Sequence, residues 1–301
     1  MPFRKVAIIG LGLLGSSVGL AVREHLSDIK TCGYDADADV RAKARELGLC
    51  DDIAESAETA AHDADLVILC VPVGAMRKAA EAIAPGLSEN AIISDVGSSK
   101  ERVSRALAET LPDHTIIPAH PVAGTEQSGP EAGFASLFHG RWCIITPPVG
   151  ADEARVEKLA DFWRGLGSTV EIMDAGHHDM VLAVTSHIPH LIAYTIVGTA
   201  SDLEDVTRSE VIKYSAGGFR DFTRIAASDP TMWRDVFLHN KDAVLEMMDR
   251  FLGDLGAMRD AIESEDGEAM FDLFSRTRAI RRGILEQGQD DARPDFGREH
   301  T

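Results

Sequence analysis

A short apolar run, Val6-Ala7-Ile8-Ile9, leads directly into the glycine-rich turn Gly10-Leu11-Gly12-Leu13-Leu14-Gly15 and then into a stretch of helical periodicity. This feature constrains the fold most, because G-x-G-x-x-G between a strand and a helix is typical of dinucleotide-binding domains. Gly10 permits the tight turn, Gly12 lets a pyrophosphate approach the backbone, and Gly15 permits close packing of helix on strand. The free N–H groups at the helix start favour bound phosphates.

An acidic residue follows at the spacing that this kind of domain requires. Asp35 stands twenty residues after Gly15 (35 − 15), at the end of the next apolar run. A carboxylate there accepts hydrogen bonds from the adenosine ribose and repels a 2′-phosphate, so NAD is favoured over NADP. The alternative is an unrelated glycine turn beside a surface aspartate.

A third strand ends at Val71 and Pro72, on the sheet edge where a ligand would lie. We predict that they line the nicotinamide ribose, although a simple strand-ending proline explains them equally well. The predicted cofactor-binding residues are Gly10, Leu11, Gly12, Leu13, Leu14, Gly15, Asp35, Val71 and Pro72.

Short apolar runs alternate with helical periods up to about residue 173, and only helical patterns follow. The strands are predicted at residues 5–9, 30–34, 66–71, 91–96, 115–119, 142–146 and 169–173. The later helices are predicted at 177–200, 208–214, 230–252, 255–264 and 267–287. We therefore predict an α/β chain: a Rossmann-type, doubly wound and mostly parallel sheet over residues 1–174, then an all-helical domain over residues 175–301 for substrate binding and dimerisation.

Charge and cysteine usage narrow the classes of partner. The formal net charge of −19 disfavours nucleic acid, and an anionic substrate would need a locally positive pocket. The four cysteines show no paired spacing and no N-terminal signal peptide is recognised, so a reduced, cytoplasmic protein is expected. The apolar stretch 180–200 is interrupted by His187, Pro189 and His190, which favours a buried helix over a membrane span.

Polar residues follow the fourth and fifth predicted strands. His120 precedes Pro121, which keeps it extended, and a histidine beside a nicotinamide is the usual general base for an alcohol proton. A purely structural histidine is the alternative. Ser98 and Glu101 form an S-x-x-E capping box, and spacing alone favours that capping role for Ser98.

Two further groups lie in the helical half. His187 and His190 stand three residues apart without another metal ligand at suitable spacing, so we predict no metal and favour a buried polar pair facing a cleft. Arg220 and Arg224 stand four apart, on one face if helical, where they can clamp carboxylates. The alternative is a solvated face paired with Asp221 and Asp229.

Several of these motifs occur together and in order. They are Gly10–Ser17, Asp95-Val96-Gly97-Ser98-Ser99-Lys100, His120-Pro121-Val122-Ala123-Gly124-Thr125-Glu126, Ser186-His187-Ile188-Pro189-His190, and Gly217–Arg224 through Trp233. In this combination the chain resembles the prephenate/arogenate (cyclohexadienyl) dehydrogenase family, from residue 4 to about residue 285.

The resemblance implies roles for individual residues. His120 matches the catalytic histidine that accepts the ring hydroxyl proton, Ser98 matches a serine that hydrogen-bonds this histidine and the same hydroxyl, and Arg224 matches an arginine that binds a substrate carboxylate. The other positions implied around the substrate pocket are His187, His190, Gly217, Arg220, Trp233 and Glu126. Either His187 or His190 is expected to face the substrate.

The implied activity is NAD-dependent oxidative decarboxylation of prephenate, arogenate or both, to 4-hydroxyphenylpyruvate or tyrosine, by a homodimer joined through the helical domain. One alternative is a β-hydroxy-acid or imine oxidoreductase of similar plan, but those relatives place their catalytic group in the helical domain. Another is a catalytically silent NAD-sensing protein, which should lack a complete base and clamp.

Overall fold

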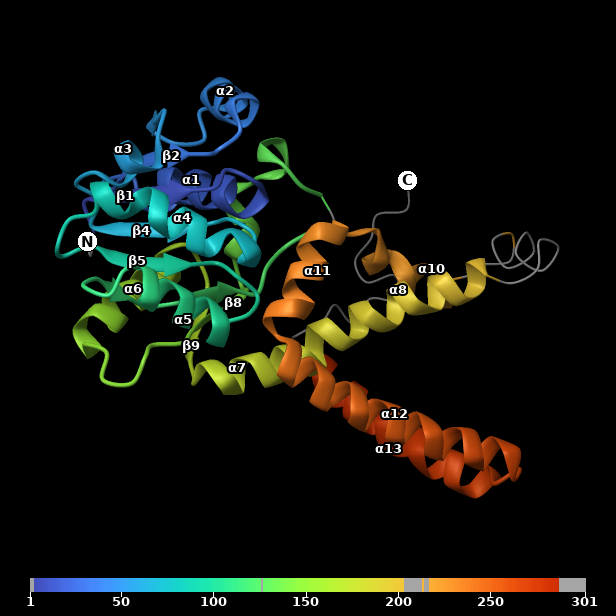
Figure 1. The fold of residues 1–301 in the computed structure, drawn as a ribbon. Helices are drawn as coiled ribbons and strands as arrows, with labels where there is room; N and C mark the ends of the chain where they lie inside the picture. The colour runs from blue at the N-terminus through green and yellow to red at the C-terminus, as the bar shows by residue number, and fades with distance from the viewer. Residues whose placement is uncertain (1–2, 126, 203–212, 214–216, 287–301) are drawn as a thin grey trace. The chain divides into compact units, whose positions relative to one another are not determined.

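The structure is a computed structural model that describes residues 3–125, 127–202, 213 and 217–286 (Figure 1). It divides into two compact units, Met1–Leu245 and Glu246–Thr301. The predicted domain boundary after residue 174 therefore falls inside the first unit, and that boundary stays a prediction. The sheets and the candidate site both belong to the first unit.

Six parallel strands form the main sheet, in the order β3-β2-β1-β4-β5-β6. Their bounds are β1 Lys5–Ile9, β2 Lys30–Tyr34, β3 Asp52–Ile53, β4 Leu66–Leu69, β5 Ile92–Asp95 and β6 Thr115–Ile116. The order reverses between β1 and β4, which is the switch point where ligands bind outside the carboxyl ends of the strands. The predicted Rossmann-type fold is confirmed. The short β3 was missed, because a two-residue strand carries no alternation to detect.

Both faces of the main sheet are covered, because successive strand residues point to opposite sides. Val6 and Ile8 belong to one core cluster, which includes residues of α1 (Leu13–His25), α2 (Ala38–Leu47) and α6 (Glu153–Gly165). Ala7 and Ile9 belong to a second cluster on the other face. That cluster includes residues of α3 (Ala57–Ala61), α4 (Met76–Ile83) and α5 (Glu101–Thr110). This double covering explains the near-continuous apolar strands.

The strand predicted at residues 115–119 is divided between two sheets. β6 ends at Ile116, and β7 (Ala119–Pro121) belongs to a second sheet with β8 (Trp142–Ile145) and β9 (Thr169–Ile172). β7 runs antiparallel to β8, and β8 runs parallel to β9. The chain changes sheet at Pro118, which lacks an N–H group to continue the first ladder.

This division corrects the expected position of His120. The residue lies inside β7, where it pairs with Ile144, and does not follow the end of a strand of the main sheet. The chain between β7 and β8 contains the short helices η3 (Pro130–Ala132) and η4 (Ala135–Phe138), which pack on α1.

The helix predicted at residues 177–200 consists of three consecutive parts. They are α7 (Ala175–Leu182), a π-helical segment η5 (Ala183–His187) and α8 (Ile188–Ser201). The widened turn precedes Pro189, which cannot donate to the helical ladder. By length and composition alone this stretch is apolar enough to cross a membrane, and 28% of its most apolar window is buried. The expected absence of a membrane stays a prediction.

The remaining helices are α10 (Gly217–Thr223), η6 (Arg224–Ala227), α11 (Pro230–His239), α12 (Lys241–Glu263) and α13 (Gly267–Glu286). As predicted, α11 begins after an Asp-Pro step, and the Asp229 side chain accepts a hydrogen bond from the Met232 N–H. The predicted break near residue 253 is wrong. The helix ends instead at Asn240, while Gly253 lies inside α12. Most of the helix predicted at 208–214 lies outside the described residues.

Candidate active site

The glycine turn has the geometry that its residue types suggest. Gly10 adopts a φ of +101°, and a Cβ there would lie 2.5 Å from the Cys70 carbonyl oxygen. A Cβ on Gly15 would overlap the Gly10 carbonyl oxygen, whereas a Cβ on Gly12 would meet nothing within 4 Å. Gly12 is also the N-cap of α1 and has no capping side chain. The turn therefore leaves space and free N–H groups at the helix start, with Leu11, Leu13 and Leu14 completing the loop.

Asp35 lies beside this turn. Its Oδ2 accepts a hydrogen bond from the Leu11 N–H at 2.8 Å, and its Oδ1 accepts one from the Asp37 N–H at 2.9 Å. The carboxylate thus connects the end of β2 to the glycine turn. Val71 is half-buried and Pro72 is exposed, immediately before the short helix η1 (Val73–Ala75).

Two glycines at the carboxyl ends of the main-sheet strands also lie close to valine side chains. A Cβ on Gly10 would lie 3.0 Å from Val71, and one on Gly97 would lie 2.9 Å from Val73. Gly97 also donates its N–H to Asp95 Oδ2 at 2.8 Å. Gly10, which follows β1, and Gly97, which follows β5, therefore both lie against residues that follow β4.

A buried ion pair lies at the end of β5. The Lys100 Nζ atom contacts Asp95 Oδ2 and donates to the Ala119 carbonyl oxygen at 2.7 Å, and both charged side chains are fully buried. Burial raises the pKa of Asp95, and the neighbouring Lys100 opposes that shift. Lys100 therefore connects β5 to the first residue of β7, next to His120.

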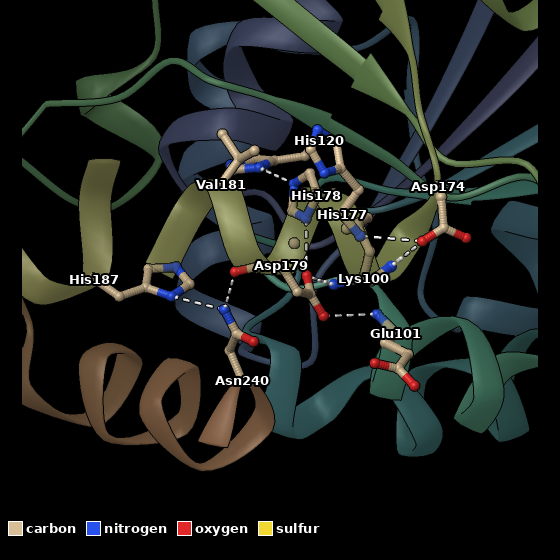
Figure 2. A network of polar contacts seen from close by, with 12 residues as sticks. Lys100, Glu101, His120, Asp174, His177, His178, Asp179, Val181, His187 and Asn240 are labelled. Carbon is tan, nitrogen blue, oxygen red and sulfur yellow. Dashed lines mark hydrogen bonds and ion pairs between the residues drawn. The ribbon is translucent and has the colours of Figure 1, made fainter. Parts of the chain in front are cut away.

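His120 is 8% exposed and belongs to a chain of buried polar side chains (Figure 2). Its Nδ1 lies 2.9 Å from His178 Nε2, and His178 Nδ1 lies 2.8 Å from Asp179 Oδ1. Burial lowers the pKa of His120 well below its usual value, and the nearby His178, Lys100 and His187 add to the shift. The ring is therefore neutral at neutral pH, as a general base must be.

Asp179 also holds the start of α5, which corrects the predicted capping box. The helix N-cap is Lys100, and no side chain of that residue caps the helix. Instead, Asp179 Oδ1 accepts from the Lys100 N–H at 2.7 Å and Oδ2 accepts from the Glu101 N–H at 2.9 Å. Ser98 is half-buried outside the helix, and its backbone interacts with the His187 ring. A cap supplied from a distant helix cannot be recognised by local spacing.

His187 is fully buried at the end of the π-helical segment. The Asn240 Nδ2 group lies 3.0 Å from His187 Nδ1 and donates to the Asp179 carbonyl oxygen at 2.7 Å. Burial lowers the pKa of His187 to about 4. Since an amide nitrogen only donates, His187 Nδ1 accepts and the ring proton lies on Nε2, which has no hydrogen-bond partner among the described residues.

His190 occupies a different environment. Its ring stacks on Trp233 with a centroid distance of 3.7 Å and an interplanar angle of 25°, and it is only partly buried. Its Nδ1 donates to the Ser186 carbonyl oxygen at 2.8 Å. Arg224 lies close enough for its charge to lower the pKa of His190, after the larger effect of burial. The structure thus brings His190, Trp233 and Arg224 together, and Arg224 is exposed.

The other residues predicted to bind the substrate are Arg220, Gly217 and Glu126. Arg220 is exposed and its Nε is 3.5 Å from Asp221 Oδ1, as the solvated-face alternative suggested. Gly217 is half-buried at the start of α10. Glu126 lies outside the described residues. Arg220 and Arg224 do not share a single α-helix, because α10 ends at Thr223.

Sequence reasoning missed four buried side chains of the site: Lys100, His178, Asp179 and Asn240. Lys100 was part of a recognised motif, but no pattern indicated that its amine is buried. The other three come from α7 and the end of α11 and meet only in the folded chain. No cluster of potential metal ligands occurs in the described part of the chain.

The chain is similar to known families and proteins over most of its length. A model for the nucleotide-binding domain of prephenate dehydrogenase matches residues 18–172, and one for the prephenate dehydrogenase dimerization domain matches residues 174–276. The chain is 44% identical over 292 residues to a cyclohexadienyl dehydrogenase of Zymomonas mobilis, covering 97% of this chain and 99% of that protein. It is 34% identical to a prephenate dehydrogenase of Bacillus subtilis, covering 93% and 76%.

A solved structure of this family has a similar fold. The prephenate dehydrogenase from A. aeolicus, crystallised with hydroxyphenyl propionate and NAD+, superposes with a TM-score of 0.87 at 34% identity, covering 93% of this chain and 98% of that one. On the basis of these similarities and of its fold, the chain is a dehydrogenase that belongs to the prephenate dehydrogenase family.

Proposed function

We propose that the protein is a cyclohexadienyl dehydrogenase, which oxidatively decarboxylates prephenate and arogenate with NAD in tyrosine biosynthesis. The observation that carries the proposal is His120, a buried, neutral histidine on β7. The neighbouring Ala119 carbonyl oxygen accepts from Lys100, which follows β5 of the sheet that ends in the open glycine turn. The breadth of substrate is supported by the Zymomonas mobilis relative, which matches almost end to end.

The nucleotide site fits NAD. The uncapped start of α1 and the open space at Gly12 suit a pyrophosphate, and Asp35 suits the adenosine ribose. The NAD+ complex of the A. aeolicus relative supports the same assignment. When bound, NAD supplies the acceptor for a hydride from the ring carbon that bears the substrate hydroxyl.

His120 removes the proton of that hydroxyl. A neutral imidazole within hydrogen-bonding reach of a hydroxyl accepts its proton as the carbonyl forms. Ser98, half-buried on the loop that follows β5, is the second group assigned to the hydroxyl. The oxidised ring is vinylogous to a β-keto acid, so the ring carboxylate leaves as CO₂ and the ring becomes aromatic. The protein therefore mainly has to position the reacting groups.

Arg224 and His190 are the groups that we assign to the acidic end of the substrate. A guanidinium binds a carboxylate through strong, directed hydrogen bonds, and the overall charge of −19 makes such a local cation necessary. His190 is partly exposed and next to Arg224, whereas His187 is fully buried and held by Asn240. His190 is therefore the histidine that we expect to contact the substrate.

The test is NADH formation by the purified protein with prephenate and, separately, with arogenate. We expect both compounds to be oxidised, and NAD to be used in preference to NADP. Oxidation of only one compound would narrow the function to a prephenate or an arogenate dehydrogenase. Oxidation of neither would refute the proposal.

We also propose a homodimer located in the cytoplasm. The family model for the helical part describes a dimerization domain. Large apolar side chains are exposed on the helices of that part, including Val184, Ile196, Leu252, Leu255, Ile262, Phe271 and Phe274. Burying such side chains against a second copy is favourable. All four cysteines are free, as expected in a reducing compartment.

A further inference from the structure

The imidazole of His120 has a buried hydrogen-bond partner that the proposed reaction does not itself require. His178 is fully buried on α7, and its ring lies edge-on to that of His120 with centroids 5.1 Å apart (Figure 2). The contact joins Nδ1 of His120 to Nε2 of His178, at 2.9 Å. A neutral histidine carries one ring proton, so this contact determines which nitrogen of His120 is free.

Asp179 decides the direction of the hydrogen bonds. Its carboxylate already accepts two backbone N–H groups, from Lys100 and Glu101, and an ionised carboxylate only accepts. His178 must therefore donate from Nδ1 to Asp179 Oδ1, 2.8 Å away. In a neutral His178 the remaining nitrogen, Nε2, is then an acceptor, and its partner in the described part of the chain is Nδ1 of His120, which must carry the proton.

We propose that His178, held by Asp179, is a positioning residue that keeps the ring proton of His120 on Nδ1 and leaves Nε2 free to accept the substrate proton. The role rests on the base function proposed above for His120. It follows the logic of the serine protease triad, in which a buried aspartate holds the catalytic histidine in its working tautomer. Here a second histidine lies between the carboxylate and the base.

The arrangement works only while His178 is neutral. If both of its nitrogens carried protons, His178 Nε2 would donate, and the proton of His120 would move to the nitrogen needed by the substrate. Burial lowers the pKa of His178, and the positive charge of Lys100 lowers it further. Asp179 and Asp95 oppose this shift without reversing its direction.

Groups on other elements that pack around the two rings also favour the neutral form of the histidines. His187, on the π-helical segment, and Lys100 both lower the pKa of His120. On β8, the pKa of Cys143 is raised well above its usual value by burial, so its thiol is neutral. The surroundings therefore favour two neutral rings in one fixed pair of tautomers.

The tautomers can be observed without substrate. We would label the histidines of the full-length protein with ¹⁵N and record long-range ¹H–¹⁵N correlation spectra with NAD bound and without it. The spectra of His120→Asn and His178→Gln assign the two rings. We expect both rings to be protonated on Nδ1 at neutral pH. A His120 ring protonated on Nε2 would overturn the proposal.

The kinetics of two His178 variants test whether this tautomer of His120 is needed for turnover. His178→Phe fills a similar volume but cannot accept a hydrogen bond, whereas the Oε1 atom of His178→Gln can take the place of Nε2. We expect His178→Phe to lower kcat roughly 10- to 100-fold, the range found when a group that orients a metal-bound histidine is removed. The KM for substrate and the Kd for NAD should change little, and His178→Gln should recover most of the lost kcat.

The neighbouring His177 provides a matched control, because it is exposed and lies on the same helix. His177→Phe should leave kcat and the His120 tautomer unchanged. Thermal unfolding of each variant shows whether it is folded. An unchanged kcat in folded His178→Phe, or equal losses in His178→Phe and His178→Gln, would overturn the proposal. If the native protein oxidised neither compound, the proposed function would fail, while the tautomer measurement would still decide the role of His178.

Discussion

At the scale of single residues, the proposed chemistry depends on a base and on a group that binds an acid. His120 and Arg224 carry opposite requirements: the first must be neutral to accept a proton, and the second must be charged to hold an acid. Burial supplies the first condition, since it lowers the pKa of His120. A guanidinium is charged in proteins whatever its surroundings, and Arg224 is exposed on η6. Each condition leads to a prediction.

His120→Asn should lower kcat by roughly 10²–10⁴-fold, the usual share of general base catalysis, and should leave NAD binding intact. The native enzyme should lose kcat/KM only as the pH falls below 6.5, because protonation of the base is displaced to lower pH. Steady-state rates between acidic and neutral pH, with NAD titrations of both proteins, provide the measurement. An acid limb at or above pH 6.5, or a fully active variant, would contradict the assignment.

Arg224→Ala should mainly raise the KM for substrate, by roughly 10- to 100-fold, because a charge-assisted hydrogen bond contributes about 1.5–3 kcal/mol. Arg220→Ala is the matched comparison, since Arg220 is exposed and already pairs with Asp221, and it should have a smaller effect. Saturation curves for substrate and for NAD distinguish the cases. A change confined to NAD affinity would argue against a substrate role for Arg224.

At the scale of elements, the site is assembled from the ends of strands and the starts of helices. The glycine turn joins β1 to α1, and Asp179 on α7 holds the start of α5. The break at Asn240 ends α11 and directs an amide to Asp179 and His187. Element ends carry unpaired backbone groups, which explains why polar side chains from other elements gather there.

The glycine turn gives an element-level prediction with an internal control. Gly15→Ala should strongly destabilise the protein, because its Cβ would overlap the Gly10 carbonyl oxygen at the junction of β1 and α1. Gly12→Ala should fold normally but bind NAD more weakly, since its Cβ would occupy the open space at the start of α1. Thermal unfolding and NAD titration separate the two effects. Equal stability of the two variants would contradict these different roles.

At the scale of the whole molecule, the proposed homodimer would cover the exposed apolar side chains of the helical part. Among them, Phe271 on α13 is 70% exposed, and most of the apolar helix Ala175–Ser201 is not buried within one chain. A second copy is the partner that agrees with the dimerization-domain match.

Sedimentation or light scattering should therefore find about twice the chain mass of 32.5 kDa. Phe271→Asp should shift the equilibrium toward monomer, because in the proposed dimer it would bury a charge where Phe271 buries an apolar ring. Val149→Asp is the control, since Val149 is fully exposed on the other part of the chain, and it should leave the mass unchanged. A stable monomer of the native chain would rule out the dimer.

Local sequence determined much of this protein. The strand–turn–helix order around Gly10–Gly15, the following Asp35 and the alternation of apolar runs were enough to predict the Rossmann-type fold, which the structure confirms. The Asp-Pro start of α11 was predicted for the same reason. These features depend on residues close in sequence, whose backbone preferences and hydrophobic periods act within one or two elements.

Only the tertiary structure decided which polar groups meet. The change of sheet at Pro118, the capping of α5 by Asp179, the burial of Lys100 and the contact of His120 with His178 each join segments far apart in the chain. No local pattern encodes them, because burial and hydrogen-bond partners depend on how distant elements pack. The lowered pKa of His120, and the tautomer that we propose for it, depend on these contacts between distant elements and not on the residue type alone.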